Sequence, residues 1–359
     1  MTIFLQKSRK HILNQPKFLQ KTYDWVARNI DKILPSFDGV KRVFLVGCGD
    51  SYFASLAGQY MFEEITSISA FSENSYEFLR YRKNLDRDTT LIAISASGRT
   101  SKTVDAAKYA KHKGARVVAL VNNPDSPLAN VSDYTILTCV DNPYGPPTAT
   151  STTAMLALAI VALHVAELNH NIDEQRYYAL LNELEKIPTI TNSVLNRSDE
   201  IIKDITREFS NIDRIYLTGA GPGYVSALFG QAKFREATWL HSMSFEAEEF
   251  HHYGMIALTD NDVIIIIAPT GKSTDKMVSL NNALKSIGVK TIVISSADPN
   301  AFSNADYLIE TQAISEIFSP IIDILPLQLL AIQLAIAKEL NVKGFRYGNI
   351  LSKLIGYYS

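Results

Sequence analysis

The sequence predicts an α/β protein with two tandem, doubly wound parallel-sheet domains of the flavodoxin-like kind and flanking helices. Three observations predict this fold class: an internal repeat, strand-like runs that are apolar throughout, and glycine turns that follow those runs. The chain has 359 residues, 47% of them hydrophobic, which is enough to bury the cores of two domains.

The repeat relates the two halves of the chain. Each half has the order strand, glycine turn, helix, strand, glycine turn, helix, strand, which indicates a duplicated α/β domain. The matched segments are 43–64 with 215–236 at an offset of 172, 90–101 with 263–274 at an offset of 173, and 114–136 with 288–309.

The predicted strands lack the alternation of a strand with one face in water. They are continuous runs of branched apolar residues, as expected for a parallel sheet that helices cover on both faces. These runs lie at 43–46, 90–94, 116–121, 263–267 and 291–295.

We expect helices, rather than a flexible tract, between the two domains. The very apolar helices at 154–168 and 321–337 are expected to be core helices, because the first is short for a bilayer and the second contains Asp323. The expected boundaries are an N-terminal helical arm at 1–35, a first domain at 36–172, linker helices at 173–210, a second domain at 211–340 and a C-terminal tail at 341–359.

The composition argues against several classes of partner. The formal net charge is −2 and the basic residues are scattered, so neither nucleic acid nor a membrane is an expected partner. Cys48 and Cys139 form no CxxC pair, and the N-terminus lacks the pattern of a signal peptide. These features predict a cytoplasmic protein in a reducing setting.

A serine-rich turn follows the second predicted strand and opens a helix. In this turn Ser95, Ser97 and Thr100 surround Gly98. The free N–H groups of a helix N-terminus suit a phosphate, hydroxyl groups add donors, and glycine permits close approach. The alternative is that the hydroxyl residues merely cap the helix.

The second half has a reduced copy of this turn. Residues 268–274 keep the glycine, but Ala268 and Pro269 stand in place of Ser95 and Ala96. The sequence therefore predicts that only the first copy holds a phosphate.

Two further segments are expected at the same edge of the first sheet, where parallel strands end. They are the turn at 47–51 and the hydroxyl-rich loop at 145–153. The turn at 47–51 lacks the third glycine of a dinucleotide fingerprint, and neither half contains a phosphate-binding GxxxxGK[ST] loop. No nucleotide cofactor is expected.

Lys233 and Glu236 lie three residues apart on one helical face. Such a pair is commonly a surface ion pair, but a carboxylate tuned by burial and a nearby charge could act as a general base. Histidines follow beside glutamates, which raises a metal site as an alternative; the sequence lacks HExxH spacing, so no metal is expected.

Four motifs in order resemble those of tandem sugar isomerase (SIS) domain proteins: GCGDSY at 47–52, SASGRT at 95–100, KFREATWLHSMSFEAEEFHH at 233–252 and PLQLLAIQLAIAKELNV at 326–342. The resemblance covers nearly the whole chain. It is to the isomerase half of glucosamine-6-phosphate synthases and to stand-alone isomerases, amino-sugar-phosphate deaminases and fructoselysine-6-phosphate deglycases. It implies a cofactor-independent homodimer that acts on a hexose 6-phosphate or amino-hexose 6-phosphate. The sequence does not begin with a nucleophilic cysteine, so we expect a glutamine-independent enzyme.

The resemblance also implies roles for individual residues. Glu236 would move a proton between C1 and C2 of the open-chain sugar, with Lys233 beside it, and Lys353 of the C-terminal tail would close over the sugar. His252 would assist ring opening from the neighbouring subunit, although counting back from Gly254 selects Tyr253 instead. The implied substrate-binding residues are Cys48, Gly49, Ser51, Ser95, Ser97, Gly98, Thr100 and Thr148.

Three residues depart from the family's pattern. Ala96 replaces its glutamine, Arg99 replaces its acid, and Asp50 stands where threonine is common. We expect an isomerase or deaminase of fructose 6-phosphate or glucosamine 6-phosphate. A deglycase of the fructoselysine-6-phosphate type and a non-catalytic phosphosugar sensor are the alternatives.

Overall fold

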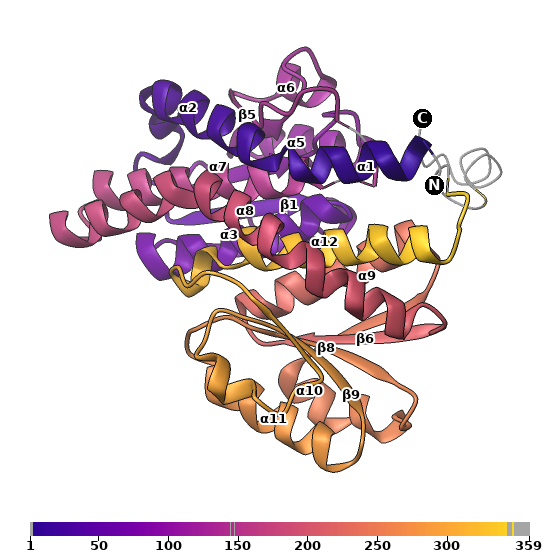
Figure 1. Cartoon of the computed structure of the whole chain (residues 1–359). Helices are drawn as coiled ribbons and strands as arrows, with labels where there is room; N and C mark the ends of the chain where they lie inside the picture. The colour runs from indigo at the N-terminus through magenta and orange to yellow at the C-terminus, as the bar shows by residue number, and fades with distance from the viewer. Residues whose placement is uncertain (1–2, 144, 147, 343–346, 348–359) are drawn as a thin grey trace. The chain divides into compact units, whose positions relative to one another are not determined.

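The computed structural model describes residues 3–143, 145–146, 148–342 and 347 (Figure 1). The chain divides into two compact units, each built on its own five-stranded sheet. Among the described residues, the first-sheet unit contains 16–143, 149–188 and 347. The second-sheet unit contains 3–15, 145–146, 148 and 189–342.

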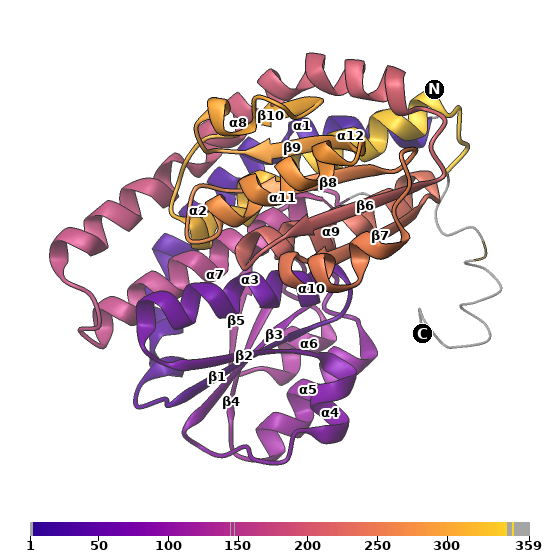
Figure 2. The ribbon, with the colours of Figure 1, turned by 90° about the horizontal axis from the view of Figure 1, so that it is seen from below.

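Five parallel strands form the first sheet in the order β2-β1-β3-β4-β5 (Figure 2). The chain reverses its direction of winding between β1 and β3, and a doubly wound sheet binds ligands in the crevice beyond the strand ends at such a point. The strands are β1 (Arg42–Gly47), β2 (Ser69–Asn74), β3 (Thr89–Ile94), β4 (Arg116–Val121) and β5 (Tyr134–Leu137).

Helices cover both faces of the first sheet. Helices α3 and α7 lie on one face, and α4, α5 and α6 lie on the other (Figure 2). The bounds in this unit are α2 (Gln15–Ile33), a 3-10 helix at Leu34–Phe37, α3 (Asp50–Thr66), α4 (Ser75–Tyr81), α5 (Ser101–His112), α6 (Pro127–Val131) and α7 (Ala149–Leu168).

The second sheet has the same topology as the first. Its order, β7-β6-β8-β9-β10, repeats the first order strand for strand, and all its neighbouring strands are parallel. The predicted fold class is therefore confirmed. The strands are β6 (Arg214–Gly219), β7 (His241–Glu246), β8 (Val263–Ala268), β9 (Lys290–Ser295) and β10 (Tyr307–Glu310).

In the second-sheet unit, α9 and α12 lie on one face and α10 and α11 on the other (Figure 1). The bounds are α1 (Ile3–Leu13), α9 (Pro222–Thr238), α10 (Ala247–His252), α11 (Thr274–Ser286) and α12 (Pro320–Ala337), with 3-10 helices at Gly254–Ala257, Pro299–Phe302 and Glu316–Phe318. Helix α8 (Glu174–Phe209) is continuous between the two repeats. The division into units falls at Pro188, where the proline removes one hydrogen bond of the helix.

The duplication extends to backbone angles at the start of the first helix of each unit. Gly49 and Gly221 both cap these helices, with φ of 56° and 51° and ψ of −129° and −126°. Two positions earlier in each motif, a Cβ on Gly47 or Gly219 would lie 2.5 Å from the backbone of the first helical turn. Glycine is therefore required at equivalent places in both copies, as the repeat predicts.

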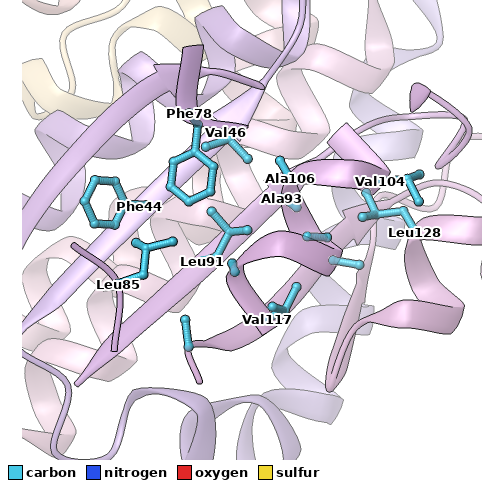
Figure 3. Close-up of a cluster of buried hydrophobic side chains, with 14 of the residues drawn as sticks. Phe44, Val46, Phe78, Leu85, Leu91, Ala93, Val104, Ala106, Val117 and Leu128 are labelled. Carbon is cyan, nitrogen blue, oxygen red and sulfur yellow. The ribbon is translucent and has the colours of Figure 1, made fainter. Parts of the chain in front are cut away.

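Apolar side chains fill the space between the first sheet and α5 (Figure 3). All six residues of β3 are buried, as are all six of β8 in the second sheet. This burial on both faces explains why the predicted strands read as continuous apolar runs. The cluster includes Phe44, Val46, Phe78, Leu85, Leu91, Ala93, Val104, Ala106, Val117 and Leu128.

None of the predicted apolar runs covers β2 or β7. Both are edge strands with the same burial pattern, in which the second residue is buried and the first and third are exposed. Their sequences, SAFSEN and HSMSFE, each have four polar residues out of six, because only part of each strand faces the core.

The two most apolar helices, α7 and α12, are long and apolar enough to cross a membrane. In the structure, however, their most apolar windows are 94% and 83% buried, as in core helices of a folded domain. Helix α1 packs against α12, and the Gln15 side chain donates to Gln328 Oε1 at 2.8 Å across 313 residues of sequence. Arg9 of α1 also pairs with Asp199 of α8.

Asp323 is the one acid in the first turn of α12, and it is almost fully buried. Its Oδ1 accepts a hydrogen bond from the Thr311 hydroxyl at 3.3 Å, and burial raises the pKa of the carboxyl to about 7. Between about pH 4 and pH 7 the folded protein therefore keeps a proton that the unfolded chain has already released. The free energy of unfolding falls as the pH rises through this window and stays low above it.

We predict that Asp323→Asn removes this loss of stability. Urea unfolding at about pH 5 and about pH 8 should show a decrease on the order of 2 kcal/mol in the wild type and a much smaller one in the variant. Asp260→Asn, which changes an exposed acid, should behave like the wild type. Equal pH dependence in Asp323→Asn and the wild type would contradict the assignment.

Candidate active site

The serine-rich turn lies between β3 and α5, at the strand ends that flank the crevice of the first sheet. Ser95 is buried, and its Oγ lies 3.0 Å from Thr100 Oγ1. The Ser95 N–H donates to the carbonyl oxygen of Leu120 in β4 at 3.0 Å. These bonds fix the start of the turn to the sheet.

Gly98 can be replaced by no other residue without distortion. Its φ is +63°, in the left-handed region, and a Cβ at this position would overlap the side chain of Ser126. Its carbonyl oxygen also accepts the N–H of Leu128 at 3.0 Å, so α6 packs directly under the turn.

The hydroxyl groups of this turn do not act as a simple helix cap. Thr100 occupies the N-cap position of α5, but its side chain makes no capping hydrogen bond. Ser97 is exposed, and its Oγ accepts the Arg99 N–H at 3.2 Å within the turn. This arrangement leaves the N-terminus of α5 without a side-chain cap, which favours an external anion over the capping alternative.

The glycine turn after β1 contacts the same helix. Cys48 is partly buried, and its Sγ lies 4.0 Å from Thr103 Oγ1 in the first turn of α5. The Ser51 N–H donates to the Cys48 carbonyl oxygen at 3.2 Å around Gly49. The structure thus brings the turns that follow β1 and β3 together, as expected for the first half of the site.

The start of α7 reaches this edge too. The Ser151 hydroxyl donates to Asp50 Oδ2 at 3.3 Å, so the acid that stands in place of the family's threonine receives a hydroxyl from α7. Thr148, just before α7, is buried, and within the described residues its hydroxyl has no hydrogen-bond partner.

In the second half the equivalent turn is filled by a carboxylate of the same chain. The N–H of Lys272 donates to Glu316 Oε2 at 2.9 Å, and the Glu316 carboxyl is so close to Gly271 that a Cβ there would overlap it. A carboxylate that accepts a backbone N–H beside the start of a helix occupies the place that suits a bound anion. The second copy has therefore lost one hydroxyl group, with Ala268 in place of Ser95, and gained an internal acceptor.

Lys233 and Glu236 form an ion pair on α9, with 2.6 Å between Lys233 Nζ and Glu236 Oε2. The Lys233 side chain is 2% exposed and that of Glu236 is 24% exposed. The pair is not a surface ion pair, because the Lys233 ammonium group is buried. A buried charge is tolerated only beside a partner of opposite charge. The carboxylate remains partly accessible while its position is fixed.

The other catalytic candidates are His252, its alternative Tyr253, and Lys353. His252 ends α10, is 65% exposed, and lies 3.4 Å from Glu248 one turn earlier. Tyr253 is also exposed, and its ring packs edge-on against Phe245 at 5.4 Å. Lys353 lies outside the described residues.

The predicted residues therefore fall into two groups. The binding residues at Cys48–Ser51 and Ser95–Thr100 belong to the first-sheet unit, whereas Thr148, Lys233, Glu236 and His252 belong to the second-sheet unit. Among the described residues, no three His, Cys, Asp or Glu side chains are grouped as metal ligands.

The family model described as "SIS domain" matches residues 37–165 and again residues 208–338. The chain belongs to the SIS-domain family. The two matches coincide with the two sheets and their helices, so each repeat is one SIS domain.

Sequence relatives of this SIS-domain chain include much longer proteins. The glutamine–fructose-6-phosphate aminotransferase (isomerizing) of Gloeobacter violaceus is 31% identical over 309 residues, which are 85% of this chain and 51% of that protein. The chain spans about half the length of the curated relatives it matches.

Solved structures share the fold over nearly the whole chain. The C-terminal domain of the glucosamine-fructose-6-phosphate aminotransferase from Francisella tularensis has a TM-score of 0.86 at 24% identity, covering 95% of this chain and 98% of that one. The glucosamine-6-phosphate deaminase from Thermotoga maritima has a TM-score of 0.77 at 20% identity, with the same coverage.

Sequence reasoning about this SIS-domain chain missed residues that shape both turns. Thr103 and Ser126 contact the first-half turns, and Glu316 fills the second. The loss of the Ser95 hydroxyl, which Ala268 replaces, was a signal that the second turn is satisfied in another way. It did not identify Glu316, which lies more than forty residues further along the chain.

We predict that Glu316→Ala destabilises the protein by about 1–2 kcal/mol, because the Lys272 N–H loses its acceptor. Added sulfate should stabilise this variant more than the wild type, because a free anion can then enter the second turn. Thermal unfolding with and without sulfate measures both effects, and Glu310→Ala, an exposed neighbour, is the control. The same sulfate response in Glu316→Ala and the wild type would refute the prediction.

Proposed function

We propose that this chain is a sugar-phosphate isomerase or amino-sugar-phosphate deaminase that acts on fructose 6-phosphate or glucosamine 6-phosphate. The observation that carries the proposal is the buried Lys233 beside Glu236, because a phosphosugar sensor has no need of a positioned carboxylate. Membership of the SIS family supports the substrate class, and the name of the Gloeobacter relative refers to fructose 6-phosphate.

The first half would bind the phosphate. Ser95, Ser97 and Thr100 supply hydroxyl groups, Gly98 allows the backbone to approach, and the uncapped start of α5 favours negative charge. Glu316 blocks the equivalent place in the second half, so one chain would bind one phosphate. A substrate fixed by its phosphate presents its other end for chemistry with little loss of entropy in the transition state.

The second half would carry out the proton transfer. The Glu236 carboxylate takes the proton from one of the carbons C1 and C2 of the open-chain sugar and returns it to the other through an enediol or enolamine. The Lys233 ammonium holds the carboxylate at 2.6 Å in a fixed position. With glucosamine 6-phosphate, this proton shift gives an imine at C2, and water converts the imine to fructose 6-phosphate and ammonia.

We also propose a cytoplasmic, glutamine-independent homodimer. The exposed imidazole of His252 at the end of α10 would assist ring opening in the site of the neighbouring subunit, with Tyr253 as the alternative. The C-terminal tail with Lys353 would close over the sugar. We also propose the domain boundaries that the sequence predicts.

The proposal predicts different kinetic effects for the two halves. Glu236→Gln should lower kcat by about 10²–10⁴-fold with little change in KM, because it removes the proton-transfer group and leaves the phosphate contacts intact. Ser95→Ala should chiefly raise KM. Two assays separate a deaminase from an isomerase. A deaminase releases ammonia and fructose 6-phosphate from added glucosamine 6-phosphate, and an isomerase forms an aldose phosphate from added fructose 6-phosphate.

Glu200→Gln, which changes a glutamate with an 85% exposed side chain on α8, is the matched control. Unchanged kcat in Glu236→Gln would exclude this carboxylate as the base. Binding of both sugar phosphates without turnover of either would show that the chain is a sensor.

A further inference from the structure

A cavity of about 440 Å³ lies at the carboxyl edge of the first sheet, apart from the turns described above. One face of α2 forms one wall with Lys21, Trp25 and Arg28. The segment after β5, with Cys139 and Val140, forms another. Its volume is within the range of sites for small organic molecules.

Hydrogen bonds and apolar packing hold the walls of the cavity in place. The Thr22 hydroxyl donates to the Thr138 carbonyl oxygen at 2.7 Å, and Phe18 of α2 packs with Val140 and Ala149 in a buried cluster. Cys139 is held at a φ of +42°, an uncommon conformation for a residue other than glycine. Cavity walls fixed in this way keep their shape without a ligand.

Asn122, which follows β4, also lines the cavity, and both polar atoms of its side chain bond to the backbone of Val140. Its Oδ1 accepts the Val140 N–H at 2.7 Å, and its Nδ2 donates to the Val140 carbonyl oxygen at 3.0 Å. Its backbone N–H donates to Ala96 in the serine-rich turn at 2.9 Å. The cavity is therefore a neighbour of the phosphate turn but not part of it.

Two of the charged groups that line the cavity already neutralise each other. Lys21 Nζ lies 2.6 Å from Asp141 Oδ2, so this pair contributes little net charge. Asp24 and Arg28 are the other two. They lie four residues apart on α2, the spacing at which an acid and an arginine commonly form an ion pair on a helix.

Asp24 and Arg28 do not form that pair. Arg28 Nε donates to the backbone carbonyl oxygen of Asp24 at 2.8 Å, and in the described part of the chain no carboxylate pairs with the terminal guanidinium nitrogens. Asp24 Oδ1 accepts from Gln20 at 2.8 Å, and among the described residues no donor is bonded to Oδ2. The cavity thus has one cationic and one anionic group available, one helical turn apart.

We propose that this cavity is a binding site for a free α-amino acid with a large apolar side chain. The carboxylate of the ligand pairs with the Arg28 guanidinium and its ammonium group with Asp24 Oδ2, so a zwitterion matches both charges. Its side chain packs on the half-buried indole of Trp25 and on Val140. An anion without the ammonium group, or an amine without the carboxylate, matches only half of the site.

Isothermal titration calorimetry with L-phenylalanine tests the proposal on the intact protein without any sugar phosphate, so its outcome is independent of the proposed enzymatic function. N-acetyl-L-phenylalanine lacks the cation and 2-phenylethylamine lacks the carboxylate. L-phenylalanine should bind saturably, and each analogue should bind at least about tenfold more weakly. Arg28→Gln and Asp24→Asn should each weaken L-phenylalanine binding by about tenfold or more, whereas Lys32→Gln, an exposed change on the same helix, should leave it unchanged.

Alkylation of Cys139 locates the ligand. L-phenylalanine should slow the reaction of iodoacetamide with Cys139, and the rate at Cys48 in the same digest is the internal control. No saturable binding of L-phenylalanine, equal binding of the three compounds, or unchanged binding in both Arg28→Gln and Asp24→Asn would each overturn the proposal.

Discussion

The close approach of the first helix to the first strand in each repeat is the constraint on which the rest of the structure depends. Gly47 and Gly219 have no Cβ, so the backbone of α3 and of α9 can contact the ends of β1 and β6. Further along these helices, Gly58 and Gly230 lie against leucines of the same strands, where a Cβ would be 2.6 Å or 2.5 Å from a methyl group. This contact sets the direction of both helices, and α9 in turn carries Lys233 and Glu236.

Duplication gave two copies of one sheet edge, and the two copies have acquired different chemistry. In the first, hydroxyl groups surround a glycine and the helix start is left uncapped. In the second, the Glu316 carboxylate satisfies the turn from within, and α9 carries an ion pair between a buried lysine and a partly accessible glutamate. The fold is the same because the buried strands and glycine positions are the same, whereas function is set by a few polar residues at the strand ends.

The sequence predicted the fold better than the site. Buried strands such as Thr89–Ile94 and Val263–Ala268 were evident because both of their faces are covered. The edge strands Ser69–Asn74 and His241–Glu246 were not, because most residues of each are polar. The serine-rich turn was placed correctly between a strand and a helix, whereas phosphate binding by this turn stays a prediction. The internal acceptor Glu316 could not be predicted, since nothing local in the sequence says which distant acid meets a turn. The roles of Glu236 and His252 remain predictions.

The packing of α1 against α12 has a consequence for the order in which the chain folds. Just after α1, Gln15 at the start of α2 bonds to Gln328 of α12, and these two residues are 313 positions apart in the sequence. The second-sheet unit therefore cannot be completed until α12 has left the ribosome, and the apolar face of α1, with Leu5 and Ile12, cannot pack against α12 while the residues between the two helices are synthesised. The first sheet, whose strands lie between residues 42 and 137, can form much earlier. During translation, the apolar face of α1 is thus exposed for longer than the strands of the first sheet.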